Sequence, residues 1–251
     1  MKSKKPLSNV YSKRLLDLAK ELSSQLKAID FSSVAFCVYD PLQYAFEPHA
    51  EYLKKYVHGP VRVLYLGMNP GPWGMVQTGI PFGEVAAVRD WLQIESSAVQ
   101  PSYVHPKRPI QGLQCTRSEV SGKRLWGLFR DRYGDAKSFF KDQFVGNYCP
   151  LAFMDEQARN LTPDKFPIAL RTQLESICDQ HLKEVIATLK PEFLIGIGAF
   201  AEACGMRALP TELKDKTKVL RVLHPSPASP AANRDWSGSV TKTLVDAGVW
   251  C

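Results

Sequence analysis

The chain has 251 residues, of which 45% are hydrophobic and 23% charged, as expected for one soluble globular domain spanning 1–251. The 32 Lys and Arg residues outnumber the 25 Asp and Glu residues, and the net charge of +7 favours a polyanionic partner. No apolar run approaches the roughly 20 residues of a membrane span, so no membrane association is predicted.

The cysteines and histidines do not form a recognisable metal-binding pattern. The six cysteines are scattered without a CxxC pair, and the five histidines include no HExxH motif. We therefore expect reduced thiols, no metal and no cofactor. The first residues are basic but lack the apolar stretch of a secretory signal. An intracellular protein is expected, in the cytoplasm or nucleoid of a bacterium or the nucleus of a eukaryote.

Strand and helix patterns alternate along the chain. Leucines at three- and four-residue spacing predict a helix within residues 1–30 that packs on the core. Short apolar runs predict strands at 34–39, 61–66, 144–148, 193–197 and 219–223. Helices are predicted at 50–57, 84–94, 121–133, 162–189, 199–209 and 235–247, and irregular segments at 44–49, 100–116 and 149–160. This alternation predicts a three-layer α/β/α sandwich around a central, mostly parallel four-stranded sheet.

The segment that follows the strand 61–66 is the strongest candidate for a ligand site. Residues 68–74 contain two prolines and two glycines, so the strand must end in a rigid loop. In open α/β sheets, ligands bind at the carboxyl ends of the strands. Large apolar side chains crowd into residues 68–82 around the polar Asn69, which favours a pocket over a simple turn.

Polar residues also follow two other predicted strands. Asn147 lies near the end of the strand 144–148, and His224 follows the strand 219–223. Since the carboxyl ends of parallel strands meet at one edge of the sheet, Asn69, Asn147 and His224 could share one cleft. Taken singly, each residue also fits a structural role, as an Asx-turn residue or a surface histidine.

A competing signal occurs at residues 196–201, GIGAFA, where a predicted strand is followed by GxGxxA. Asp215 lies roughly 20 residues further on, as in the dinucleotide-binding fingerprint. This pattern leaves a nucleotide-dependent oxidoreductase as an alternative. A tight strand-to-helix turn is the favoured interpretation, because Asp215 lies in a charged loop and not at the end of a second strand.

Two motifs together resemble a known family. Residues 67–72, GMNPGP, with 79–84, GIPFGE, and residues 224–227, HPSP, resemble the signature motifs of the single-strand-selective monofunctional uracil-DNA glycosylases. Further similarity occurs at 119–122, 144–151 and 159–163. The resemblance extends from about residue 41 to residue 236. It implies a uracil-DNA glycosylase-like fold.

The resemblance also implies a role for individual residues. Asn69 would position the attacking water, and His224 would stabilise the departing uracil anion. Asn147 would read the polar edge of the base, and Phe82 would stack on its face. Because an amide cannot act as a general base, such a reaction would be dissociative and would depend on electrostatic stabilisation of the leaving group.

The same resemblance implies contacts outside the chemistry. The backbone around Met68 and Gly71 would shape the base pocket, and residues 225–236 would fill the gap that a flipped base leaves in the duplex. Ala228 stands where vertebrate members of the family carry arginine, and Arg234 is a candidate for part of that role. The expected DNA-contacting residues are Pro225, Ser226, Pro227, Ala228, Ser229, Pro230, Asn233 and Arg234.

The resemblance therefore implies a monomeric DNA-repair hydrolase that acts without a cofactor. It would remove uracil, and oxidised uracils such as 5-hydroxymethyluracil, from single- and double-stranded DNA and leave an abasic site. The base would be flipped out of the duplex, which costs less in single strands and mismatches. The alternative is a non-catalytic module of the same fold that binds single-stranded DNA.

Overall fold

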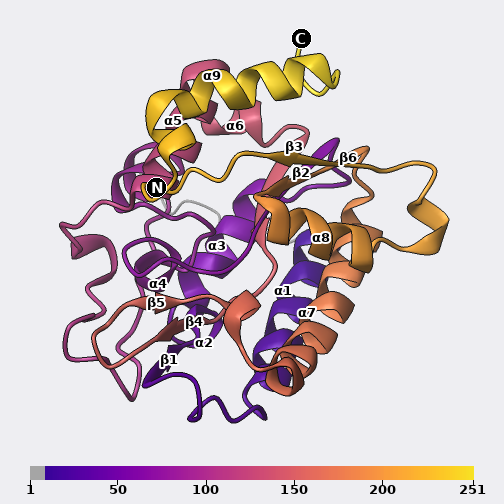
Figure 1. Ribbon diagram of the computed structural model, residues 1–251. Coiled ribbons are helices and arrows are strands. Elements are labelled where there is room, and N and C mark those ends of the chain that lie inside the picture. Colours follow the sequence, from indigo (N-terminus) through magenta and orange to yellow (C-terminus); the bar gives the residue numbers. More distant parts are fainter. Residues whose placement is uncertain (1–8) are drawn as a thin grey trace.

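A parallel four-stranded sheet forms the centre of the molecule in the computed structural model, which describes residues 9–251 (Figure 1). Its strand order is β3 (Gln143–Asn147), β2 (Val63–Gly67), β6 (Phe193–Ile197) and β7 (Lys218–Val222). Every β2 residue is buried, because helices cover both faces of the sheet and leave it no polar face. The predicted α/β/α sandwich is confirmed.

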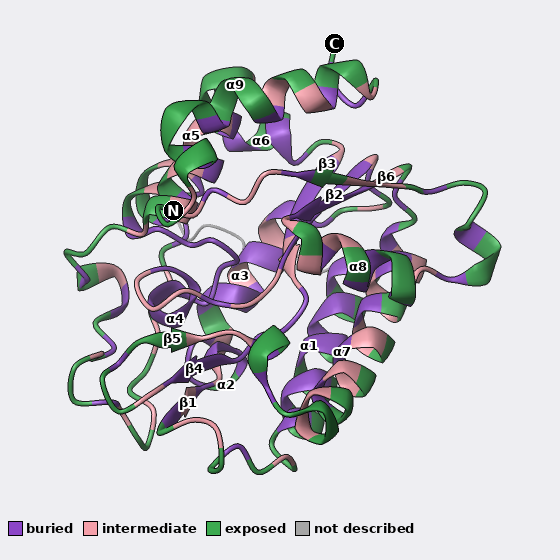
Figure 2. Cartoon of the chain, in the orientation of Figure 1, coloured by how far each residue is buried: buried purple, intermediate pink, exposed green. Residues whose placement is uncertain are grey.

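The helices form two layers (Figure 1). On one face lie α1 (Val10–Leu26), α3 (Phe46–Tyr56), α7 (Ile168–Leu189) and α8 (Ala199–Ala208). On the other lie α5 (Val120–Tyr133), α6 (Ala136–Phe139) and α9 (Pro230–Asp246). Figure 2 shows how the buried stripes of α1 and α7 face the sheet while their outer faces are exposed. The predicted N-terminal helix is confirmed from Val10 onward, and its expected residues 1–8 lie outside the described residues.

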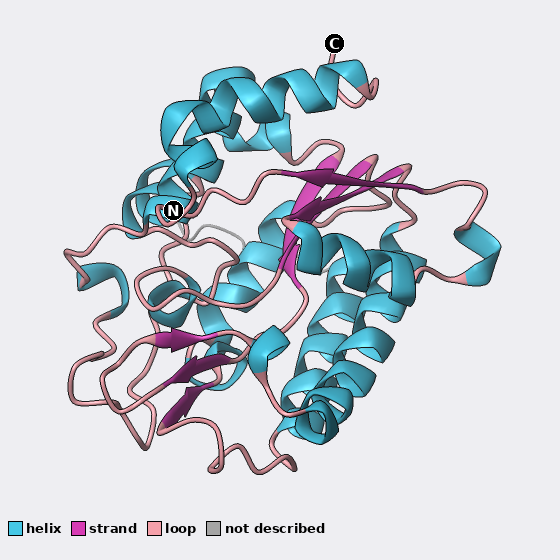
Figure 3. Ribbon diagram, in the orientation of Figure 1, coloured by secondary structure: helices cyan, strands magenta, loops and turns pink. Residues whose placement is uncertain are grey.

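A second, antiparallel sheet lies beside the first (Figure 3). It consists of β1 (Cys37–Tyr39), β4 (Ala152–Met154) and β5 (Asn160–Leu161), in that order. The predicted strand 34–39 therefore begins late and belongs to this small sheet, and the predicted loop 149–160 contains two short strands. The prediction missed the pairing of β1 with β4 because it joins segments more than 100 residues apart, and it missed the β4–β5 pair because these strands have only three and two residues.

Several other boundaries were predicted wrongly. Residues 44–49 are helical, in α2 (Pro41–Tyr44) and α3, and the Gly/Pro-rich loop contains the short helix α4 (Met75–Thr78). The predicted helix 84–94 is a short helix with a π turn at Ala87–Trp91. Thr162 precedes only a 3₁₀ turn, Pro163–Lys165, and α7 starts after Pro167. The last helix begins at Pro230, not near 235, and is kinked at Asp235.

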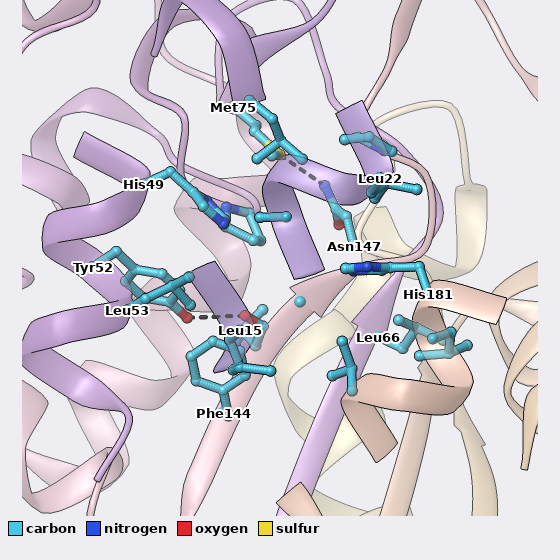
Figure 4. Close-up of a pocket in the computed structure, with 18 of the residues that line it drawn as sticks. Leu15, Leu22, His49, Tyr52, Leu53, Leu66, Met75, Phe144, Asn147 and His181 are labelled. Carbon is cyan, nitrogen blue, oxygen red and sulfur yellow. Dashed lines mark hydrogen bonds between the residues drawn. The ribbon is translucent and has the colours of Figure 1, made fainter. Parts of the chain in front are cut away.

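Two neutral histidines lie in the core between α1, α3, α7 and the sheet, around a cavity of about 70 Å³ (Figure 4). Nδ1 of His49 donates to the Gly79 carbonyl at 2.9 Å, whereas Nδ1 of His181 has no partner among the described residues. Burial lowers the pKa of each to about 4, and the neighbouring His49 contributes to the shift at His181.

These pKa values predict an acid-sensitive core. Between pH 6.5 and 4, His181 is protonated in the unfolded chain but remains neutral in the folded protein. The contribution of neutral His181 to the free energy of unfolding is therefore fully present above pH 6.5 and is lost as the pH falls toward 4. We expect His181→Gln to weaken the fall in unfolding free energy over this window, by up to roughly 3 kcal/mol. Urea denaturation at several pH values measures it. His58→Gln, at an exposed position, is the control, and identical pH dependence in both variants would contradict the prediction.

Candidate functional site

The site lies where the parallel strands end. Gly67 pairs with Asn147 in register, Asn69 follows β2, and His224 follows β7. A cavity of about 450 Å³ opens at this edge of the sheet. It brings together the side chains predicted to contact a base, and its lining includes Met68, Asn69, Gly71, Phe82, Asn147 and His224.

The loop that carries Asn69 is anchored to the segment after β3. The Met68 carbonyl accepts from the Cys149 N–H at 2.8 Å, and Asn69 Nδ2 donates to the Leu151 carbonyl at 3.3 Å. Asn160 Nδ2, at the start of β5, lies 3.5 Å from the Pro70 carbonyl. The small antiparallel sheet thus helps to hold the loop, and the contact to Leu151 fixes the orientation of the Asn69 amide.

Asn147 lies in the wall of this cavity and of the core cavity in Figure 4, and its side-chain oxygen is unsatisfied. Its Nδ2 lies 3.3 Å from Met75 Sδ, a contact drawn in Figure 4. Its Oδ1 is buried and has no hydrogen-bond partner within residues 9–251. A buried polar atom left unpaired costs about 1–3 kcal/mol. Because Nδ2 already contacts Met75, Oδ1 is the amide atom left without a partner, and it could accept a hydrogen bond from a ligand.

Phe82 and His224 are neighbours in the cavity wall, with ring centroids 6.3 Å apart and ring planes tilted by 43°. Phe82 has a φ of 53°, and its carbonyl accepts from Trp126 Nε1 at 3.1 Å. This contact to α5 helps to hold a backbone conformation that side chains usually avoid. Burial lowers the pKa of His224, so its ring is neutral at pH 7. A neutral imidazole can donate one N–H to an acceptor in the cavity.

Glu119 is a cavity residue for which the sequence analysis predicted no role. Its carboxyl lies against the loop after β2: a Cβ at Gly74 would lie 1.6 Å from Oε2, and one at Gly71 would lie 2.5 Å from Oε1. Oε2 is buried without a hydrogen-bond partner among the described residues. Burial raises the pKa of Glu119 to about 7, helped by the negative charge of Glu84. No local pattern distinguishes this glutamate from an exposed one at the start of α5.

The residues predicted to contact DNA form a turn that runs into α9. Ser226 and Pro227 line the cavity, and Ala228 and Arg234 are exposed. Arg124 of α5 anchors the turn, because its guanidinium donates to the Pro225 carbonyl at 3.1 Å and to Asn233 Oδ1 at 2.8 Å. Pro225, Ser229, Pro230 and Asn233 do not line the cavity. The sequence did not predict that Arg124 supports this segment.

The GxGxxA segment serves packing. A Cβ at Gly196 would lie 2.3 Å from the backbone N of Glu202, so α8 can approach β6 only because Gly196 has no side chain. Gly198 has a φ of 96°, and a Cβ there would lie 3.4 Å from the His224 Cβ. Asp215 lies in the turn between Thr211–Leu213 and β7. These glycines fit the tight-turn interpretation and help to place His224.

Neither a metal site nor a membrane span emerges from residues 9–251. No three His, Cys, Asp or Glu side chains in this range are grouped to hold a metal ion. None of the described helices combines the length and apolarity needed to cross a bilayer.

Comparisons with known proteins identify the family of the chain. Residues 54–241 match the family model described as the uracil DNA glycosylase superfamily. The single-strand selective monofunctional uracil-DNA glycosylases of Rattus norvegicus and Bos taurus are each 44% identical to the chain. The alignments cover 97% and 91% of this chain and 87% and 84% of those proteins. A crystal structure of Pedobacter heparinus SMUG2 has the same fold, with a TM-score of 0.65 at 15% identity over 95% of this chain and 97% of that one. The chain belongs to the single-strand-selective monofunctional uracil-DNA glycosylase family of the uracil-DNA glycosylase superfamily.

Proposed function

We propose that this protein is a monofunctional uracil-DNA glycosylase, which hydrolyses the N-glycosidic bond of uracil in DNA and leaves an abasic site. The observation that carries the proposal is the convergence of Asn69, Asn147 and His224 on one cavity whose wall includes Phe82. The 44% identity to relatives named for this activity supports it.

The residues divide the chemistry among binding, leaving-group stabilisation and water delivery. Phe82 stacks on the extruded base, and Asn147 pairs with its N3–H and O4. Neutral His224 donates an N–H to O2 as the glycosidic bond breaks and negative charge accumulates on uracil. Asn69 orients a water toward the sugar carbon, which has gained oxocarbenium character. No step requires Asn69 to remove a proton before the bond breaks.

We extend the proposal to a monomer that flips its target from single- and double-stranded DNA and also removes oxidised uracils such as 5-hydroxymethyluracil. The volume of the cavity, about 450 Å³, supports room for a substituted base. Segment 225–236 is proposed to occupy the space that the flipped nucleotide leaves. The protein would work inside the cell, in whichever compartment holds the DNA.

The alternative is a module that binds single-stranded DNA without cleaving it. Incubating the protein with oligonucleotides that contain one uracil, 5-hydroxymethyluracil, thymine or hypoxanthine separates the two. Alkali-sensitive abasic sites from the uracil strand support the glycosylase, whereas tight binding without abasic sites supports the module. Single-stranded and duplex versions of each substrate report the strand preference.

Removing the two groups proposed to act in the transition state should slow chemistry and spare binding. We expect Asn69→Ala and His224→Ala each to lower single-turnover excision of uracil by ~10²–10³, the loss typical of one oxyanion-hole donor. Binding to the same strand, measured by fluorescence anisotropy, should persist. His58→Ala, at an exposed position, controls for loss of a histidine, and near-wild-type excision by either site variant would contradict the assigned roles.

Asn147 should choose uracil over cytosine. Uracil offers an N3–H donor and an O4 acceptor, whereas cytosine reverses both, so a fixed amide meets two mismatched contacts of about 1–3 kcal/mol each. The Met75 contact is suited to keeping the amide in the uracil orientation. We expect Asn147→Asp to lose most uracil excision and gain a small, acid-favoured excision of unpaired cytosine. An unchanged ratio of the two activities would reduce Asn147 to a structural role.

Glu119 should make the activity pH-dependent near neutrality. The neutral carboxyl packs against Gly71 and Gly74, and ionisation above its pKa of about 7 favours its leaving that contact for solvent. The neutral carboxyl of Glu119 therefore stabilises the folded protein at low pH, and this contribution is lost as the pH rises from 4.5 toward 7. We expect single-turnover excision to fall above pH 7 and Glu119→Gln to remove that fall. The control is Glu212→Gln, on an exposed turn, which should keep the wild-type dependence of excision on pH. A wild-type pH dependence in Glu119→Gln would contradict this role of Glu119.

A further inference from the structure

Two arginines share one tryptophan at the mouth of the cavity. The guanidinium carbon of Arg108 lies 4.9 Å from the centroid of the Trp73 ring, and that of Arg117 lies 5.2 Å from it. Trp73 itself lines the cavity that holds Asn69 and His224. The ring therefore holds two positive charges next to the wall of this cavity.

Neither guanidinium is neutralised. No ion pair within residues 9–251 includes Arg108 or Arg117. Arg108 donates through one terminal nitrogen to the Lys107 carbonyl, and its Nε is buried without a partner. Two like charges on one ring repel each other, and an unpaired buried N–H costs free energy, so an anion bound between the two groups would lower both costs.

Arg108 lies on a segment that is tied to the loop after β2. The Arg108 carbonyl accepts from the Tyr39 hydroxyl at 2.6 Å. Fully buried Gln77 of α4 donates to the Pro72 and Pro109 carbonyls at 3.1 and 3.0 Å. The segment 100–116, which the sequence indicated only as an irregular basic surface, therefore holds a fixed position relative to Asn69.

We propose that Arg108 and Arg117, stacked on Trp73, bind a backbone phosphate of the DNA strand that carries the target base. A phosphodiester fits because guanidinium groups donate two parallel N–H bonds to phosphate oxygens, and the flat ring holds the groups in place. Contacts of this kind fix the register of a strand and carry no base information. The inference rests on the proposed function, since it assumes that a DNA strand crosses this opening.

The test measures binding of a single-stranded oligonucleotide that carries an abasic-site analogue, over a range of NaCl concentrations. Each phosphate contact to a single strand contributes about 0.7 to the slope of log affinity against log salt. We expect Arg117→Gln to make the slope shallower by about that amount, and Arg117→Lys to keep most of it. Arg14→Gln, in α1, is the matched control, because Arg14 is exposed and pairs only with Glu184 among the described residues.

A second measurement locates the phosphate. Neutral methylphosphonate linkages are placed one at a time on either side of the analogue, and one position should weaken wild-type binding more than its neighbours. At that position Arg117→Gln should show no further loss, because charge and partner are removed together. Wild-type slopes in both Arg108→Gln and Arg117→Gln would overturn the inference. Failure of the wild-type protein to excise uracil would instead overturn the proposed function.

Discussion

The end of β2 can carry no side chain, and the whole site depends on this constraint. A Cβ at Gly67 would lie 2.3 Å from Asn147 Oδ1 and 2.6 Å from the Phe82 ring. The amide of one strand end and the aromatic ring of the following loop therefore both pack on the bare Gly67 backbone. Since Gly67 pairs with Asn147 in the parallel ladder, the sheet register itself sets which side chain meets the ring. Asn69 is two residues after Gly67, so the position of Gly67 in the sheet also determines where Asn69 lies.

The sequence predicted the strand ends well and the supporting contacts poorly, for physical reasons. Asn69, Asn147 and His224 each follow a short apolar run, and parallel strands place such residues at one edge whatever the rest of the chain does. Arg124 and Glu119 act through partners on other elements, so nothing in their local sequence distinguishes them from ordinary helix residues. The small antiparallel sheet was missed for the same reason. The start of α9 was misplaced because its first turns precede the kink at Asp235.

The contacts that hold segment 225–234 in place indicate what the alanine at position 228 affects. Arg124 bonds the Pro225 carbonyl and Asn233, and Asn233 Nδ2 bonds the Pro227 carbonyl at 2.8 Å. Trp236 Nε1 donates to the Leu223 carbonyl at 2.6 Å, and this contact ties α9 to the residue that precedes His224. The shape of the turn is thus set by contacts that do not involve residue 228. An arginine at this exposed position would add charge toward DNA, and its replacement by alanine leaves the turn and the position of His224 intact.

Burial separates the two electrostatic tasks of the site. Inside, desolvation lowers the pKa of His224 and raises that of Glu119 to about 7, so at pH 7 the cavity wall gains no positive charge from His224 and carries a partial negative charge at Glu119. Preorganised uncharged dipoles can stabilise charge that develops on a leaving group without first attracting a counterion. Attraction of a polyanion must therefore come from outside the cavity, where a net charge of +7 is available. Arg108 and Arg117 lie against Trp73, which lines the cavity, and neither arginine is itself part of the cavity lining, so their charges are placed where the proposed phosphate contact requires them.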